Sequence, residues 1–452
     1  MSKINKYEEI IKSSVVQTEM HLPTGKKGDI SDQKNVLYSV HQRGKQKTLW
    51  YQSSWESMTD QNVPTNPELV TYRSKIYPYH SLHRSLLSTL TPEIKAKEGY
   101  EIRFCDDLFI NMIQEFRLTF NDTELQFGND KFLSFNLKLR KDWDTISDEI
   151  GNRESLVSWS DSLKSEFISI YLPWCYAVDK SDAFPLNLCG QTDRLEHIIE
   201  FNLRLQNLLL IRNSETQEMV EFDRSLIEVS NNSEIIPIPE MEGLYTTLTS
   251  KECEYISCIK DEDEGRKEYF SNSIYYVEDE NETTLGKKVH LKIDSKSNYP
   301  VTSIFWGAQN LTLSETEKSS VFHHINDGEM YSPVKTTKIE SSVGTVLENK
   351  SSYKTEKGYS SSQFERVPTT PGFNLWKNSV LCHDDPRKFL PGIKFNSGSV
   401  VMTLNDKNRS SNDRFLAFCI LCHSKKFYFT KYPTTQEERL HNGATIVLLE
   451  DN

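Results

Sequence analysis

The sequence lacks several features that would assign it to a common class of protein. A bilayer-spanning helix needs about 20 apolar residues, and the longest apolar cluster, residues 208–211, is far shorter. Residues 1–20 are polar and contain no hydrophobic stretch of the kind that defines a secretory signal peptide. Alanine, the best helix former, is scarce. We therefore expect a protein that is made in the cytosol and contains little helix.

Long runs of lysine and arginine are also missing. Nucleic-acid binders usually carry a basic face, because contacts to phosphate dominate their affinity. This chain instead has a formal net charge of −12. We expect no direct sequence-specific binding of nucleic acid. Without a signal peptide, the eight cysteines are expected to be mostly reduced and buried thiols.

Signatures of catalysis are missing as well. The sequence has no Gly-x-Ser-x-Gly elbow, no P-loop and no glycine-rich dinucleotide loop. Residues 24–28 lack the upstream glycine and the following Ser or Thr of a phosphate-binding loop. His323 and His324 fall in a long polar segment. The prediction is a protein that is not an enzyme, with no catalytic, cofactor-binding or metal-binding residues and no cofactor.

One short segment does match a chemical motif. Cys419-Ile-Leu-Cys422-His423 has the form of a c-type haem attachment site. The surrounding residues are typical of a β-strand, in which residues three apart point to opposite faces. We therefore interpret both cysteines as core thiols. The alternative, a thiol-bound metal or haem protein, would need further converging ligands such as Cys382 and His383.

Alternation with a period of two is the dominant pattern in the sequence. Residues 116–120, 199–205 and 289–293 each alternate apolar with polar side chains, which indicates strands with one buried face. Further strands are predicted near residues 35–41, 46–51, 68–76, 99–105, 131–139, 167–173, 222–229, 244–249, 253–259, 271–277, 300–306, 373–382, 398–404, 414–421, 425–430 and 444–449.

The number of strands predicts the fold class. A chain of 452 residues, rich in Tyr and Phe, has room for two domains. We predict an all-β protein made of two consecutive jelly-roll β-sandwiches, a double jelly roll, with long surface loops. The predicted organisation is an N-terminal arm at residues 1–30, a first jelly roll at 31–213, a join at 213–221, and a second jelly roll at 222–452 with a long loop at about 312–366. A shorter loop with a helix is expected at 140–165.

Several segments, taken in order, resemble the double jelly-roll major capsid proteins of large and nucleocytoplasmic double-stranded DNA viruses. The first is residues 102–121, where a strand and a short turn lead into a second strand. Asn396 departs from the family's Pro-Ser-Gly signature, and residues 222–290 match the family poorly. The remaining similar segments are residues 170–176, 183–188, 199–203, 299–310, 373–386, 395–405 and 442–448.

The resemblance implies a structural protein of an icosahedral virus shell. It implies a homotrimer, about three times 52.5 kDa, that forms a pseudo-hexagonal capsomer and contacts neighbouring capsomers and minor capsid or penton proteins. The protein would be located in the virion, with its inner side near a viral membrane, after synthesis and assembly in the host cytoplasm. The arm at 1–30 would lie inside, and the 312–366 loop outside.

Two other functions stay open from the sequence. One is a minor capsid or scaffold homologue of the same family. The other is a jelly-roll protein that binds or processes carbohydrate, which would need exposed aromatic side chains beside a pair of carboxylates. Trp50 and Trp55 are the candidate aromatic residues.

Overall fold

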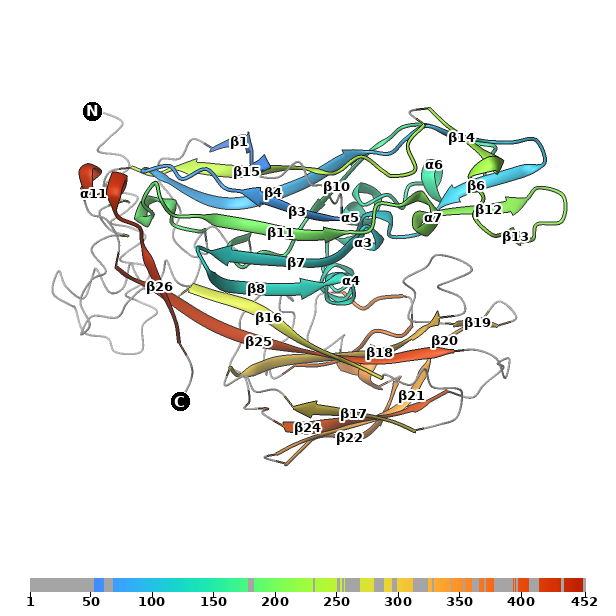
Figure 1. The fold of residues 1–452 in the computed structure, drawn as a ribbon. Helices are drawn as coiled ribbons and strands as arrows, with labels where there is room; N and C mark the ends of the chain where they lie inside the picture. Colours follow the sequence, from blue (N-terminus) through green and yellow to red (C-terminus); the bar gives the residue numbers. More distant parts are fainter. Residues whose placement is uncertain are drawn as a thin grey trace, which may run out of the picture.

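The structure is a computed structural model, and Figure 1 shows its fold. The structure describes residues 53–60, 68–177, 183–249 except 231, and 269–279. It also describes residues 288–294, 299–311, 324–326, 329–359 except 343 and 353, and 366–377 except 370. The last described ranges are 395–405 except 396 and 414–449 except 432–434, and residues 253, 256 and 393 are described singly.

The first half is a sandwich of two antiparallel sheets. One sheet has the strand order β1 (Ser53–Ser57), β15 (Glu240–Thr247), β4 (His80–Leu90), β10 (Phe167–Tyr171). The other has the order β2 (Thr59–Asp60), β3 (Leu69–Arg73), β11 (Leu195–Phe201), β7 (Ile113–Phe120), β8 (Thr123–Asn129). Between them lies an apolar core in which Phe116, Leu118 and Tyr245 are fully buried.

Two small sheets extend the first half at one end, on the right in Figure 1. Their strand orders are β13 (Met219–Val220), β12 (Leu209–Asn213), β6 (Tyr100–Phe104) and β14 (Ile227–Val229), β5 (Ile94–Ala96), β9 (Ser162–Leu163). The helices of this half are α3 (Leu108–Asn111), α4 (Asp130–Lys138), α5 (Trp143–Glu149), α6 (Glu154–Val157) and α7 (Leu205–Leu208). Short 3-10 turns are η1 (Cys175–Ala177), η3 (Leu186–Leu188) and η4 (Arg224–Leu226).

The second half is also a two-sheet sandwich. Its inner sheet has the order β16 (Tyr269–Glu278), β25 (Phe415–Lys431), β18 (Val301–Asn310), β23 (Asn374–Lys377), and β26 (Thr445–Leu449) pairs with the far end of β25. Its outer sheet has the order β17 (Lys288–Asp294), β24 (Ser397–Leu404), β21 (Val334–Ser341), β22 (Gly344–Ser351). A hairpin of β19 (His324–Asn326) and β20 (Glu329–Tyr331), the π-helix η5 (Lys354–Tyr359) and α11 (Gln436–His441) complete it.

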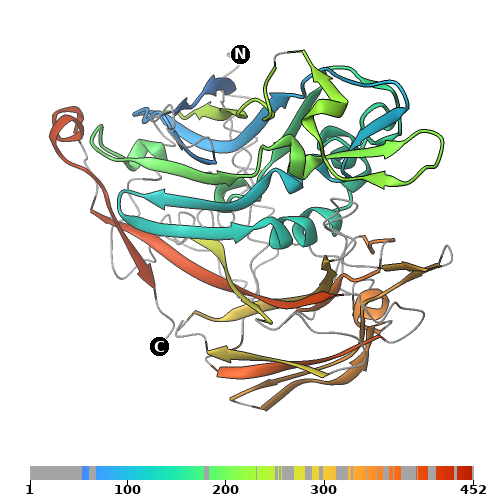
Figure 2. The same cartoon turned by 45° about the vertical axis from the view of Figure 1, so that its right-hand side comes forward.

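The inner sheet of the second half contributes to two cores at once. Phe418, Ile420 and Cys422 on β25 join the core of the first half, whereas Cys419 and Leu421 join the core of the second. Successive side chains of a strand point to opposite faces, so a strand buried on both faces becomes continuously apolar. Figures 1 and 2 show this sheet lying between the first half and the outer sheet of the second half. The two sandwiches are therefore packed into one body.

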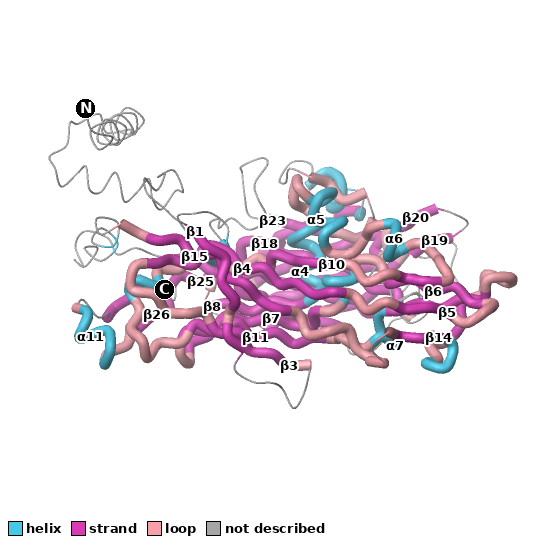
Figure 3. The backbone as a smooth tube through the Cα atoms, turned by 90° about the horizontal axis from the view of Figure 1, so that it is seen from above, coloured by secondary structure: helices cyan, strands magenta, loops and turns pink. Residues whose placement is uncertain are grey.

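The strands run mainly along the long dimension of the molecule, as Figure 3 shows from above.

Most predicted strands in the described residues are confirmed, and two predicted at 414–421 and 425–430 form the single long β25. The predictions at 35–41 and 46–51, most of 253–259, and the arm at 1–30 lie outside the described residues. The helix expected within 140–165 is confirmed by α5 and α6.

One predicted strand is wrong, and the longest of the strands that were not predicted is β4. Residues 131–139 were predicted as a strand but form the helix α4, whose N-terminus is capped by the Asn129 side chain accepting from the Phe132 amide. Residues 132–137 are all buried, so no polar face marks the helical period. In β4 the inward positions include Ser85 and Thr89, so its alternation was hidden.

The predicted boundaries also need correction. Residues 213–221 were expected to join the halves, but β12 and β13 pair across this segment as a hairpin within the first half. The later strand β15 returns to pair with both β1 and β4, so the first half continues to Thr247. The segment at 312–366 is not one long loop, because β21 and β22 lie within it and belong to the outer sheet.

Candidate functional site

The cysteine motif lies inside the inner sheet of the second half. Cys419 and Cys422 are both buried on β25 and face different cores. Burial raises the pKa of both thiols, that of Cys422 to about 12. His423 is also buried, with Nδ1 3.0 Å from the carbonyl oxygen of Tyr299, and burial lowers its pKa. The interpretation as core thiols is confirmed, because the three side chains cannot reach one ligand together.

Most of the other residues considered as ligands are not among the described residues. Cys382, His383 and His323 lie outside the described residues. Within the described ranges, no group of three or more His, Cys, Asp or Glu side chains is placed to hold a metal ion. Among the same residues, no helix is both long and apolar enough to cross a membrane.

A buried polar cluster in the first half resembles a catalytic arrangement only superficially. The Tyr176 hydroxyl lies 2.7 Å from Nε2 of His197 and 3.1 Å from Oγ of Ser85. Trp174 packs its ring edge-on against the His197 imidazole at 5.0 Å between centroids. All four side chains are buried, and burial lowers the pKa of His197 to about 3. The cluster is enclosed in the core and is closed to a substrate.

The two halves of the molecule meet at a junction that contains several distinct contacts. At one place the edge strand β8 of the first half meets the edge strand β16 of the second. The Phe127 amide donates a hydrogen bond of 3.1 Å to Oγ of Ser273, and the Ser271 hydroxyl donates to the Leu125 carbonyl. Serine hydroxyls thus satisfy backbone groups that an open sheet edge would leave without partners. Lys425 and Glu124 add an ion pair of 3.5 Å across the same junction.

An aromatic cluster fills a second part of this junction. Phe135 projects from α4 and is fully buried. Its ring lies 5.0 Å from that of Phe305, 4.9 Å from that of Phe373 and 6.3 Å from that of Phe418, centroid to centroid. These three partners belong to the second half. Aromatic pairs at such separations stabilise a core beyond the burial of their area.

The C-terminal segment forms a third connection, by returning to the first half. The buried carboxylate of Asp193 accepts hydrogen bonds from the amides of Gly190 and Ala444, at 2.8 and 2.7 Å. The Gln191 amide donates to the carbonyl of Arg439 on α11 at 2.8 Å. A Cβ atom at Gly190 would overlap the carbonyl oxygen of Asn442, so glycine is required at this contact. The sequence pattern did not mark Asp193, because its role depends on a partner 251 residues away.

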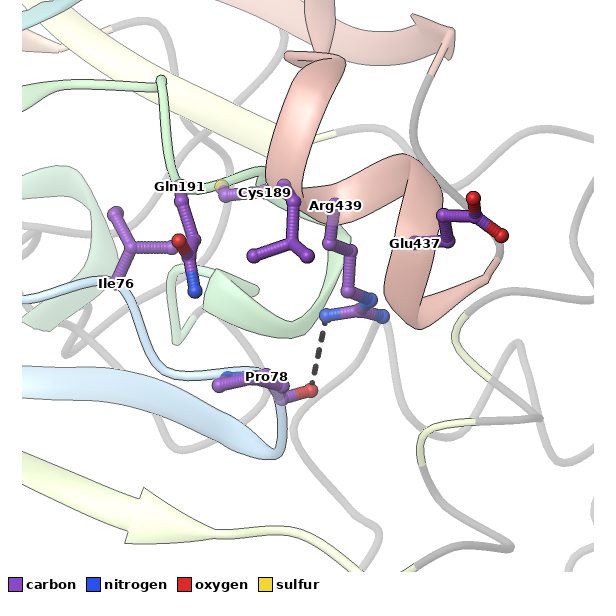
Figure 4. Close-up of a pocket in the computed structure, with 7 residues that line it drawn as sticks. Ile76, Pro78, Cys189, Gln191, Glu437 and Arg439 are labelled. Carbon is purple, nitrogen blue, oxygen red and sulfur yellow. Dashed lines mark hydrogen bonds between the residues drawn. The ribbon is translucent and has the colours of Figure 1, made fainter.

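A cavity of about 400 Å³ lies where this segment meets the first half, and Figure 4 shows it. Arg439 lies at its wall and donates a hydrogen bond of 3.2 Å to the carbonyl of Pro78. The remaining lining comes from Ile76, Cys189, Gln191, Glu437 and Leu440. Burial raises the pKa of Cys189, so this thiol is not an activated nucleophile. The cavity belongs to the packing of α11 on the first half.

Of the two aromatic residues considered for carbohydrate binding, the structure describes only Trp55. Trp50 lies outside the described residues. Trp55 is 42% exposed on β1, and its ring centroid lies 6.3 Å from that of Tyr171. These side chains lie on the face of a sheet rather than in the cavity described above.

Each of the two sandwiches has two antiparallel sheets, and the inner sheet of the second sandwich joins them. This arrangement is the double jelly-roll fold, so the predicted fold class is confirmed. This is the fold of major capsid proteins of large double-stranded DNA viruses. The Faustovirus major capsid protein aligns with a TM-score of 0.62 at 7% identity, over 94% of this chain and 99% of that chain. The PBCV-1 virus capsid aligns with a TM-score of 0.62 at 9% identity, over 84% of this chain and 95% of that chain.

A third solved structure, that of the Sputnik virophage, aligns with a TM-score of 0.54 at 11% identity, over 86% of this chain and 90% of that chain. No family model matches the sequence, and no curated protein matches it. The likeness is therefore one of fold, preserved at sequence identities of 7 to 11%.

Proposed function

We propose that this protein is the major capsid protein of an icosahedral double-stranded DNA virus. Three copies form a pseudo-hexagonal capsomer, and the capsomers tile the shell. The observation that carries the proposal is the end-to-end correspondence with the Faustovirus major capsid protein, which covers 94% of this chain and 99% of that one. Both sandwiches and their connection take part in this correspondence, so the likeness is not limited to a single common β-domain.

The internal packing supports a role as a rigid subunit of a virus shell. The halves share an apolar sheet, an aromatic cluster around Phe135 and a C-terminal connection through Asp193. A large apolar interface within a chain restricts the relative motion of its domains. A tile of fixed shape can repeat the same contacts around a closed shell, as symmetric assembly requires.

The partners and location follow from this role. The protein binds two further copies of itself, then neighbouring capsomers, and then minor capsid or penton proteins. Its inner side lies near a viral membrane, and it reaches the virion after synthesis and assembly in the host cytoplasm. With a net charge of −12 it does not bind nucleic acid sequence-specifically. It acts as a structural molecule without enzymatic turnover.

The mass of the purified protein in solution tests the proposal. Light scattering after size-exclusion chromatography should give about three times the chain mass of 52.5 kDa, and negative-stain electron microscopy should show particles with a hexagonal outline. A folded protein that stays monomeric at micromolar concentration would overturn the proposal. Trimers that fail to join into sheets or shells under any condition would favour a minor capsid or scaffold role instead.

A further inference from the structure

The segment after α11 contains the only Asn-Gly sequence in the chain, at Asn442 and Gly443. Asparagine followed by glycine is the pair most prone to deamidation, because glycine has no side chain to hinder attack by its own backbone nitrogen on the asparagine side chain. Asn442 is exposed, so water reaches it. Within the described ranges, the Gly443 amide donates to no backbone carbonyl. These two residues therefore have the chemistry of a site of covalent modification.

The same two residues take part in the connection between the C-terminal segment and the first half. The carbonyl oxygen of Asn442 lies against Gly190, where a Cβ atom would overlap it. A Cβ atom at Gly443 would overlap Oδ1 of Asp193, so the carboxylate lies against this glycine. The next amide, that of Ala444, donates to Oδ2 of the same carboxylate at 2.7 Å. We call these five residues the C-terminal clamp.

Deamidation of Asn442 needs no co-reactant other than water. The Gly443 nitrogen loses its proton to hydroxide and forms a bond to Cγ of Asn442. The bond between Cγ and Nδ2 breaks, and Nδ2 takes up a proton from water and leaves as ammonia. Water then opens the five-membered succinimide ring at either of its carbonyl groups. The products are aspartate and isoaspartate at position 442, and each carries a negative charge in place of a neutral amide.

The C-terminal clamp holds Asn442 in a conformation that opposes this ring closure. The backbone of Asn442 is extended, with φ −116° and ψ 137°. Closure of the ring requires the Gly443 nitrogen to turn about the Cα–C bond of Asn442 until it lies beside Cβ. This rotation moves the Asn442 carbonyl away from Gly190 and the Ala444 amide away from Asp193. The reaction therefore starts from a state in which the clamp has opened locally.

Either product prevents the clamp from closing as before. Isoaspartate adds a methylene group to the main chain between positions 442 and 443, so the Ala444 amide no longer meets the Asp193 carboxylate. Both products also place a new carboxylate on the residue next to Gly443, which lies against Asp193. Like charges at such a separation repel each other.

We propose that Asn442 is a deamidation site whose reactivity is controlled by the C-terminal clamp, and that its modification releases the C-terminal segment from the first half. The inference goes beyond the proposed function and does not depend on it, because it concerns contacts within one chain. The modification does not reverse in water. It therefore accumulates with the age of the protein, and the connection between the C-terminal segment and the first half weakens as it does so.

The rate of deamidation tests control by the clamp. Peptide mapping by mass spectrometry follows the conversion of Asn442 in the full-length protein, folded and unfolded in urea, at neutral pH and one temperature. Asp193→Ala should raise the rate in the folded protein at least tenfold, toward the rate in urea. Gly190→Ala should also raise it, because the added Cβ atom displaces the Asn442 carbonyl. Circular dichroism establishes that each variant is folded.

Asn213 provides an internal control in the same peptide map. It precedes Ser214, and its side chain accepts hydrogen bonds from the amides of Glu215 and Thr216 at 2.9 and 3.0 Å, in the hairpin of β12 and β13. This hairpin is remote in sequence from the C-terminal clamp. The rate of deamidation at Asn213 should therefore be the same in the wild type and in both folded variants.

Limited proteolysis tests the release of the C-terminal segment. Asn442→Asp, which carries the charge of one product, should be cut between residues 432 and 449 at least threefold faster than the wild type when both are freshly purified. Wild-type protein aged until Asn442 has reacted should also be cut faster. Asn442→Gln, in which ring closure is slow, should keep its initial rate of cleavage after the same period.

Each part of the inference can fail separately. Absence of reaction at Asn442 in the urea-unfolded chain overturns the assignment of the site. Equal rates at Asn442 in the folded wild type and in urea overturn control by the clamp, and this comparison decides even if both clamp variants fail to fold. A modified protein and an Asn442→Asp variant that are cut no faster than the fresh wild type overturn the release of the C-terminal segment.

Discussion

The carboxylate of Asp193 accepts a hydrogen bond of 2.7 Å from the backbone amide of Ala444, 251 residues later in the chain. The same carboxylate accepts from the amide of Gly190 and lies 3.1 Å from Nδ2 of Asn121. One buried side chain thus ties the segment after α11 to the first half. Because this contact joins the C-terminal segment to the first half, a substitution of Asp193 tests how the two parts are held together.

We expect Asp193→Ala to lower the free energy of unfolding by about 3 kcal/mol, because two buried backbone amides lose a charged acceptor. Limited proteolysis should become faster at sites between residues 432 and 449, since the C-terminal segment is released from the first half. Asp148→Ala, at an exposed position of α5, is the control and should change stability by less than about 0.5 kcal/mol. Equal effects of the two substitutions would contradict the role of Asp193.

The Phe135 ring offers a test of the junction between the halves. Phe135→Ala removes the side chain that contacts Phe305, Phe373 and Phe418. A buried Phe→Ala change costs about 3–5 kcal/mol, and urea unfolding should show that loss. The exposed Phe167→Ala is the control for monomer stability, with an expected cost below about 1 kcal/mol. If the two halves unfold independently, urea unfolding will show two transitions, and only one of them will shift in the variant.

Loss of the Ser273 contact at the sheet edge should lower the free energy of unfolding by less than the Phe135 substitution does. Ser273→Ala leaves the Phe127 amide without its acceptor, and such a loss costs about 1–2 kcal/mol. Hydrogen exchange at the Phe127 amide should become faster, because the amide loses its protecting partner. Ser399→Ala on the outward surface of β24 should leave that exchange rate unchanged. If the exchange rate of the Phe127 amide is unchanged in Ser273→Ala, the Ser273 hydroxyl does not protect this amide.

The buried His197 predicts how stability depends on pH. Burial lowers its folded pKa to about 3, from the ordinary value of 6.5. Between these values the unfolded chain binds a proton that the folded chain does not bind, so acidification favours unfolding. At pH 4 this group alone should reduce the free energy of unfolding by about 3 kcal/mol relative to pH 7.

His197→Gln removes this titration while keeping an acceptor for the Tyr176 hydroxyl. The difference in stability between pH 7 and pH 4 should therefore shrink by about 3 kcal/mol in the variant, as measured by denaturant unfolding at each pH. His290→Gln, at an exposed position of β17, should retain the wild-type difference. If the His197→Gln variant keeps the full wild-type difference in stability between pH 7 and pH 4, groups other than His197 control that difference.

The sequence alone determined much of the local structure. In β17 the strict alternation of Val289, Leu291 and Ile293 with polar residues produced a strand with one buried face, because the period of a strand is two. The strand at Cys419 and Cys422 could also be predicted, together with the conclusion that the two thiols point apart. These features depend on neighbours a few residues away.

Only the tertiary structure decided the features that depend on distant partners. The helix α4 has a strand-like sequence, and it becomes a helix because Asn129 caps it and the packing between the halves buries it on every side. The return of β15 to β4 moved the boundary of the first half, since pairing between strands is not encoded in either strand by itself. The contact of Asp193 with Ala444 likewise appears only when residues far apart in the chain are brought together.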